Sequence, residues 1–137
     1  VEASVVPEGT RCGAYKVSKR REMDISAVAA CYSVTLDEAG TVTAARLAYG
    51  GMAATTARAT KAEAAMVGQP WTEATVEAAA AAIDQDFAPI DDHRGSAWYR
   101  ATVARNLLRG FFLETQQTPV PSLPDRPVGT VQLQVVP

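Results

Sequence analysis

Residues 28–51 read VAACYSVTLDEAGTVTAARLAYGG, and this stretch decides the fold. Over 28–36 the even-numbered positions are apolar or aromatic and alternate with smaller or more polar residues. This alternation places the even-numbered residues on one face of a β-strand. The segment 37–40 is typical of a compact turn, and β-forming residues resume over 41–49 before two glycines at 50–51. The stretch therefore predicts a β-hairpin that ends at these glycines.

A strand is expected before the hairpin and a short helix after it. Residues 11–18 mix glycine with tyrosine and valine in a strand-like pattern. Beyond the hairpin, Thr60 and Glu63 have the spacing of a capping box, in which two side chains satisfy backbone N–H groups at the start of a helix. Gly68 is a suitable helix-ending residue, so we expect a short helix that Gly68 closes.

Two longer helices are expected further along the chain. Thr72 is the expected N-cap of the first, which should end before Pro89 and carries an apolar stripe: Val76, Ala79, Ala80 and Ile83. Ser96 is the expected N-cap of the second, which should run to about Glu114. Five aromatic residues are expected to pack in the core and between helices rather than to form a cofactor site: Trp71, Trp98, Tyr99, Phe111 and Phe112. This order predicts the α+β class, a small antiparallel sheet containing a β-hairpin and packed on one face by about three helices.

Length and charge limit the class of protein. The 137 residues suffice for a single domain, in which 1–12 are expected to be a linker and 115–137 a proline-rich tail whose residues 131–135 alternate as a last strand would. A net charge of −2 argues against nucleic-acid binding, and no stretch approaches the roughly 20 apolar residues of a membrane span. Cys12 and Cys31 could form a disulfide, but reduced thiols in a cytoplasmic protein are favoured because a chain of this size folds without a cross-link.

The residues by themselves predict no self-contained active site. Two cysteines and one histidine are too few for an iron–sulfur cluster or a zinc centre. The glycines at 50–51 lack the pattern of a phosphate-binding loop, so a tight strand exit is favoured. Residues 16–21 hold four cations that could attract a pyrophosphate, although a solvated loop neutralised by the acidic residues that follow is favoured in isolation. Asp92, His93 and Ser96 have the residue types of a hydrolase triad, but triads usually combine distant segments.

Four blocks of sequence carry a family resemblance. They are YKVSKRREMDISAV at 15–28, LAYGGMA at 47–53, PWT at 70–72 and DHRGSAWYR at 92–100. In this order they resemble the C-terminal part of the FAD domain of xanthine dehydrogenases, over about residues 13–114. The residues of these blocks are most similar to those of the small subunit of bacterial xanthine dehydrogenases. Other molybdenum hydroxylases, such as carbon monoxide dehydrogenase, share a looser version.

The resemblance implies the flavin arm of a molybdenum-containing xanthine dehydrogenase, an oxidoreductase. In such an enzyme a molybdopterin centre oxidises hypoxanthine or xanthine to urate, [2Fe–2S] clusters carry the electrons, and FAD passes them to NAD⁺. This chain would have no activity alone and would help to bind FAD and to shape NAD⁺ access. Val1 would then mark a nick in a longer subunit.

The resemblance also implies partners. FAD would be shared with an upstream FAD-binding segment, and further partners would be [2Fe–2S] segments and a molybdopterin-binding large subunit, whose cofactors this chain would not bind. Two alternatives remain open. The chain could be the flavin-subunit segment of another molybdenum hydroxylase, such as carbon monoxide dehydrogenase, or a docking module that binds no cofactor.

The implied site residues bind cofactors, and none is catalytic or a metal ligand. Lys16 would contact FAD, where a cation stabilises negative charge on the reduced flavin. The loop beside the flavin ring and the nicotinamide approach would contribute Arg20, Arg21, Met23, Asp24 and Ile25. Met23 stands where mammalian relatives have an acidic residue, so their dehydrogenase-to-oxidase change is not carried over, while Asp24 is expected to pair with Arg20 or Arg21. Less direct contacts would come from Tyr49, Gly50 and Gly51, near the domain junction, and from Pro89, at the dinucleotide entrance.

Overall fold

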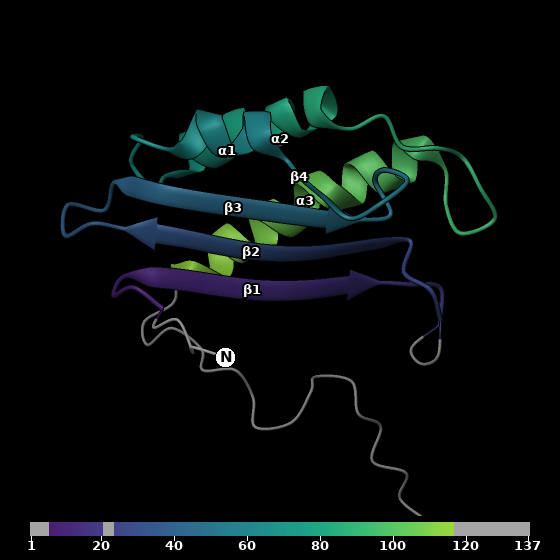
Figure 1. The fold of residues 1–137 in the computed structure, drawn as a ribbon, viewed down its shortest axis with the longest axis horizontal. Coiled ribbons are helices and arrows are strands. Elements are labelled where there is room, and N and C mark those ends of the chain that lie inside the picture. Colours follow the sequence, from purple (N-terminus) through teal and green to yellow (C-terminus); the bar gives the residue numbers. More distant parts are fainter. Residues whose placement is uncertain (1–5, 21–23, 117–137) are drawn as a thin grey trace, which may run out of the picture.

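The computed structural model describes residues 6–20 and 24–116, and its elements follow the expected order (Figure 1). They are β1 (Thr10–Val17), β2 (Val28–Leu36), β3 (Val42–Gly50), β4 (Ala57–Arg58), α1 (Thr60–Met66), α2 (Glu73–Asp86) and α3 (Ala97–Thr115). The strands form one antiparallel sheet in the order β1-β2-β3-β4. Helix α1 packs on β3, and α3 packs on β2 and β1, so the predicted α+β class is confirmed.

The predicted hairpin forms because its alternation matches its burial. The apolar residues of β2 face the helices and are buried, whereas the intervening ones face away from them. Gly40 has a φ of +80° in the turn, and Asp37 Oδ1 accepts hydrogen bonds from the backbone N–H groups of Ala39 and Thr41, both at 2.9 Å. A side-chain acceptor and a glycine that tolerates positive φ together set the register of β2 against β3.

A pair of tyrosines connects the sheet to α3 inside the core. The Tyr32 hydroxyl donates to the Tyr49 hydroxyl at 2.9 Å, and the Tyr49 hydroxyl donates to the Ala104 carbonyl at 3.1 Å. The Phe111 ring lies 5.3 Å from the Tyr32 ring, so apolar contact accompanies the polar chain. Burial raises the pKa of both tyrosines, because an ionised phenolate would lose its solvation there.

Helix α1 begins at Thr60, but the predicted capping box does not form. Ala59 is the N-cap, and no side chain bonds from that position. Glu63 instead accepts hydrogen bonds from the Leu47 backbone N–H at 2.8 Å and from the Arg58 guanidinium at 2.9 and 2.6 Å. The Glu63 carboxylate therefore pairs a backbone N–H on the edge of β3, beyond the short β4. Asp86 caps α1 from a distance, since its carboxylate accepts two first-turn N–H groups at 2.9 and 3.0 Å.

Two of the expected core aromatics are exposed instead. Trp98 is 73% exposed and Tyr99 39% exposed, because both lie off the face of α3 that carries the buried residues Arg100, Ala104, Leu108 and Phe111. The remaining three pack as expected, with Trp71 and Phe111 buried and Phe112 partly buried against the core.

The helix ends and the small strand show smaller differences. Thr72 is the N-cap of α2, although its side chain makes no capping bond, while Ser96 Oγ accepts the Tyr99 N–H at 3.1 Å as predicted. Strand β4 was not expected, since two residues carry no periodic signal. Strand β1 begins at Thr10, inside the segment 1–12 assigned above to a linker. The strand suggested for 131–135 lies outside the described residues.

The sheet face opposite the helices carries small or exposed side chains. Cys12 and Cys31 lie there on neighbouring strands, both free and exposed, in agreement with the favoured reduced state. Lys16 lies on the same face at the end of β1, with its backbone opposite Ala29 of β2.

Candidate functional site

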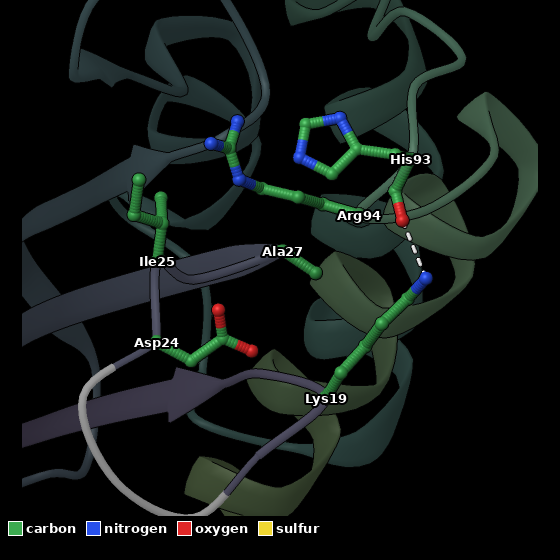
Figure 2. A pocket seen from close by; sticks show the side chains of 6 residues that line it. All are labelled: Lys19, Asp24, Ile25, Ala27, His93 and Arg94. Carbon is green, nitrogen blue, oxygen red and sulfur yellow. Dashed lines mark hydrogen bonds between the residues drawn. The ribbon is translucent and has the colours of Figure 1, made fainter.

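The candidate site lies where β1 ends and β2 begins. Loop 18–27 joins these strands, and its base is closed by a hydrogen bond from the Ala27 N–H to the Val17 carbonyl at 2.8 Å. The turn at 91–95, before α3, lies against this loop (Figure 2). Between them is a hollow of about 110 Å³, here called the loop–turn cavity, which is lined by Lys19, Asp24, Ile25, Ala27, His93 and Arg94.

Asp24 organises the described part of the loop. Its Oδ2 accepts the Arg20 backbone N–H at 3.2 Å, and the Arg20 Nε lies 3.9 Å from the same oxygen. The expectation that Asp24 pairs with Arg20 or Arg21 is therefore confirmed for Arg20, while Arg21 and Met23 lie outside the described residues. Because the Arg20 side chain is 74% exposed, the backbone bond holds the loop more firmly than the ion pair does.

A lysine and an arginine connect the loop to the turn. Lys19 Nζ donates to the His93 carbonyl across the cavity (Figure 2). Behind the cavity, the Arg100 guanidinium is only 4% exposed and donates from Nη1 to the Ala27 carbonyl at 2.6 Å and to the Gly51 carbonyl at 2.8 Å. Its Nη2 donates to Asp92 Oδ1 at 2.6 Å. Arg100 thus joins the loop, the end of the hairpin and the turn.

Sequence reasoning missed Arg100, although a signal was present. Arg100 precedes Ala104, Leu108 and Phe111 at helical spacing, and all three are buried. An arginine in the buried stripe of a helix must find acceptors in the core, because its charge is too costly to bury unpaired. Its Nε is buried and has no partner among the described residues.

Asp92 organises the turn through backbone bonds. Its Oδ1 accepts the N–H groups of Arg94 at 2.8 Å and Gly95 at 3.2 Å, in addition to Arg100 Nη2. The Arg94 N–H, followed by the Arg100 guanidinium, lowers the pKa of Asp92 below its ordinary value. Because Asp92 is used in this way and Ser96 caps α3, these residues do not form a hydrolase triad.

The two glycines of the hairpin exit differ. Gly51 has a φ of +80°, and a Cβ on it would lie 2.2 Å from the Ala27 carbonyl oxygen, so the favoured interpretation as a tight strand exit is confirmed there. Gly50 ends β3 in an ordinary conformation, and a Cβ on it would be no closer than 3.5 Å to its neighbours.

Several expected site residues lie away from the cavity. The cavity brings together Asp24 and Ile25 of the expected set and adds Lys19, His93 and Arg94. Lys16 is exposed on the open sheet face, Tyr49 is fully buried in the core, and Pro89 is half-buried between α2 and α3. The described ranges contain no group of three or more side chains able to hold a metal ion. No helix within them is long and apolar enough to cross a membrane.

Known proteins resemble this chain in fold or in sequence. A carbon monoxide dehydrogenase from Hydrogenophaga pseudoflava superposes with a TM-score of 0.69 at 30% identity, over 76% of this chain and 36% of that chain. A xanthine dehydrogenase of Emericella nidulans is 39% identical over 106 residues, covering 77% of this chain and 8% of that protein. The glyceraldehyde dehydrogenase medium chain of Sulfolobus acidocaldarius is 30% identical over 100 residues, covering 73% of this chain and 35% of that protein.

The fold is an α+β module with a hollow, lined in part by Lys19 and Arg94, where β1 ends and β2 begins. The chain belongs to the CO dehydrogenase flavoprotein C-terminal domain family, whose model matches residues 13–115. It spans about a third or less of the length of the relatives described above.

Proposed function

We propose that this chain is the C-terminal segment of the flavin subunit of a xanthine dehydrogenase, where it helps to bind FAD and borders the approach of NAD⁺. The observation that carries the proposal is the 39% identity to the Emericella nidulans xanthine dehydrogenase over 106 residues. The family match over residues 13–115 includes the candidate loop and turn. The partners would be an upstream FAD-binding segment, [2Fe–2S] segments and a molybdopterin-binding large subunit.

The described residues fit one wall of a flavin site. A flavin dinucleotide needs cations near its phosphates and near the ring that becomes negative on reduction. The chain supplies exposed Lys16 on β1 and, beyond it, Lys19 and Arg94 at the cavity. The bound FAD would supply electron transfer to NAD⁺. Lys16 would stabilise the reduced ring, and the loop held by Asp24 would border the nicotinamide approach, together with Ile25.

The test is a Lys16→Met variant of the intact complex. We expect weaker FAD binding or slower NADH formation, with oxidation of the purine at the molybdenum centre largely unchanged. Lys61→Met is the matched control, because Lys61 lies on α1 and donates only to the Gln85 carbonyl at 3.1 Å. If Lys16→Met has the flavin absorbance and NADH formation of wild type, a docking module without cofactor contact explains the chain better.

A second candidate differs only in the partner enzyme. The match to carbon monoxide dehydrogenase supports the flavin subunit of another molybdenum hydroxylase. Substrate choice lies at the molybdenum site, on another part of the complex, so the residues of this chain do not distinguish the two. The test is to measure the rates at which the purified complex oxidises xanthine, carbon monoxide and aldehydes. The substrate that is oxidised fastest indicates the enzyme to which this chain belongs.

A further inference from the structure

The loop–turn cavity holds more hydrogen-bond donors than acceptors. An ammonium group has three N–H donors and a guanidinium five. Lys19 directs one donor to the His93 carbonyl, and within the described ranges no carboxylate lies in ion-pair distance of the Arg94 guanidinium. Among the described residues Asp24 is the one carboxylate that lines the cavity, and it already accepts the Arg20 backbone N–H. The remaining N–H donors face solvent and are available to a partner rich in acceptors.

The walls that present these cations are fixed in advance. Arg100 binds the Ala27 carbonyl on the loop side and Asp92 on the turn side, so one buried guanidinium sets the distance between the walls. Asp92 in turn holds the Arg94 N–H, and Lys19 crosses from the loop to the turn. A cavity whose walls are already held in place loses less entropy on binding an anion than a mobile loop would.

We propose that the loop–turn cavity is an anion subsite that binds a phosphate group of a nucleotide, with Lys19 and Arg94 as the cations that line it. Its volume of about 110 Å³ leaves room for one phosphate group. A guanidinium binds phosphate oxygens in pairs, and an ammonium group adds a point charge. Figure 2 shows Lys19 reaching to the turn while the Arg94 side chain runs toward Ile25.

The inference rests on the proposed function for the source of the phosphate. FAD and NAD⁺ both carry a pyrophosphate, so the same chemistry has two sources. Ile25 is 64% exposed at the cavity, so an apolar surface is available to the part of the nucleotide that remains outside. The experiment below separates the two sources by measuring the affinity for each dinucleotide.

The test compares Lys19→Met and Arg94→Met in the purified complex, both as the holoenzyme and after removal of FAD, with inorganic pyrophosphate as a direct probe of the vacated site. Each variant removes a charge but keeps an apolar stem. We expect calorimetric pyrophosphate affinity to fall about tenfold, the equivalent of about 1.4 kcal/mol, because one charge-assisted contact is lost. Arg94→Lys should recover part of the loss. Matched controls are Lys61→Met and Arg46→Met, since Arg46 lies exposed in the middle of β3, away from the cavity.

Two dinucleotide measurements assign the source. The phosphate in the cavity belongs to NAD⁺ if the KM for NAD⁺ rises tenfold in the variants. In that case kcat, the FAD content and turnover with a phosphate-free dye should be unchanged. A tenfold rise in the FAD dissociation constant assigns the flavin phosphate. Unchanged affinities for pyrophosphate, FAD and NAD⁺ in both variants overturn the inference. If Lys16→Met still weakens FAD binding or NADH formation in that case, the proposed function stands; if Lys16→Met also has no effect, the proposed function fails as well.

Discussion

Arg100→Met should destabilise the chain because it removes the guanidinium that joins three segments. Methionine keeps most of the length and apolar contact of the arginine stem. It cannot donate to the Ala27 carbonyl, the Gly51 carbonyl or Asp92, which Arg100 contacts at 2.6, 2.8 and 2.6 Å. These acceptors belong to the loop, to the end of β3 and to the turn, so the loss acts on both walls of the loop–turn cavity.

The magnitude follows from which groups are left without a partner. Leaving a buried acceptor without its donor typically costs about 1 to 3 kcal/mol. Arg100→Met leaves two backbone carbonyls without this donor, those of Ala27 and Gly51. The Asp92 side chain is 25% exposed and can bind water, and the Arg100 Nε has no partner to lose, so these add little. We therefore expect a loss of about 3 to 4 kcal/mol in the free energy of unfolding. That is a large part of the roughly 5 to 15 kcal/mol of an ordinary domain.

Urea unfolding followed by tryptophan fluorescence measures this change. Arg46→Met is the control, because this exposed arginine lies on the open face of the sheet and its replacement should change stability by less than about 0.5 kcal/mol. Arg100→Lys should fall between wild type and Arg100→Met, since an ammonium group keeps the charge but loses the planar arrangement of donors. A loss below about 1 kcal/mol in Arg100→Met would refute the reasoning, because it would mean that water replaces the guanidinium without cost.

Three further predictions concern the core, the hairpin exit and the turn. Tyr49→Phe should lower the free energy of unfolding by about 1 to 2 kcal/mol, because the Ala104 carbonyl and Tyr32 hydroxyl lose a partner; an unchanged urea midpoint would contradict this. Gly51→Ala should cost at least about 2 kcal/mol in the same assay, since its φ is +80° and the new Cβ would meet a carbonyl at 2.2 Å, whereas Gly50→Ala, the control, should cost less. Asp92 has a lowered pKa in the folded state, so its stabilising contribution is present above its ordinary value of 3.8 and is lost as the pH falls below it. When the pH is lowered from neutral to below about 4, the free energy of unfolding should therefore fall less in Asp92→Asn than in wild type. Parallel pH profiles of the two proteins would be evidence against this role.

The spacing of apolar residues predicted the hairpin and the two long helices well, because this spacing repeats over neighbouring residues and matches the period of a strand or a helix. The alternation of β2 and the stripe of α2 each report which face meets the core. The capping box at Thr60 failed for a physical reason. A glutamate three residues into a helix can bond backward locally, but Glu63 also lies beside the unpaired Leu47 N–H and the Arg58 guanidinium, and these non-local donors bind it instead.

The same limit explains the exposed aromatic residues. Residue type predicts that a tryptophan is buried, yet burial depends on what lies opposite it. Trp98 lies off the face of α3 that carries Arg100 and Ala104, whereas Phe111 lies on that face against Tyr32. Residue type alone does not state which face of a helix meets the sheet.

The sequence by itself determined the class of fold, the compact turn at 37–40, the cap at Ser96 and the family resemblance. Each of these depends on residues within a few positions of one another, or on ordered blocks. The tertiary structure alone decided that Lys19 and Arg94 line one cavity, that Lys16 lies outside it, and that Arg100 holds its two walls. Lys19 and His93 are 74 positions apart, and only the packing of α3 on β1 and β2 brings such distant side chains to one place.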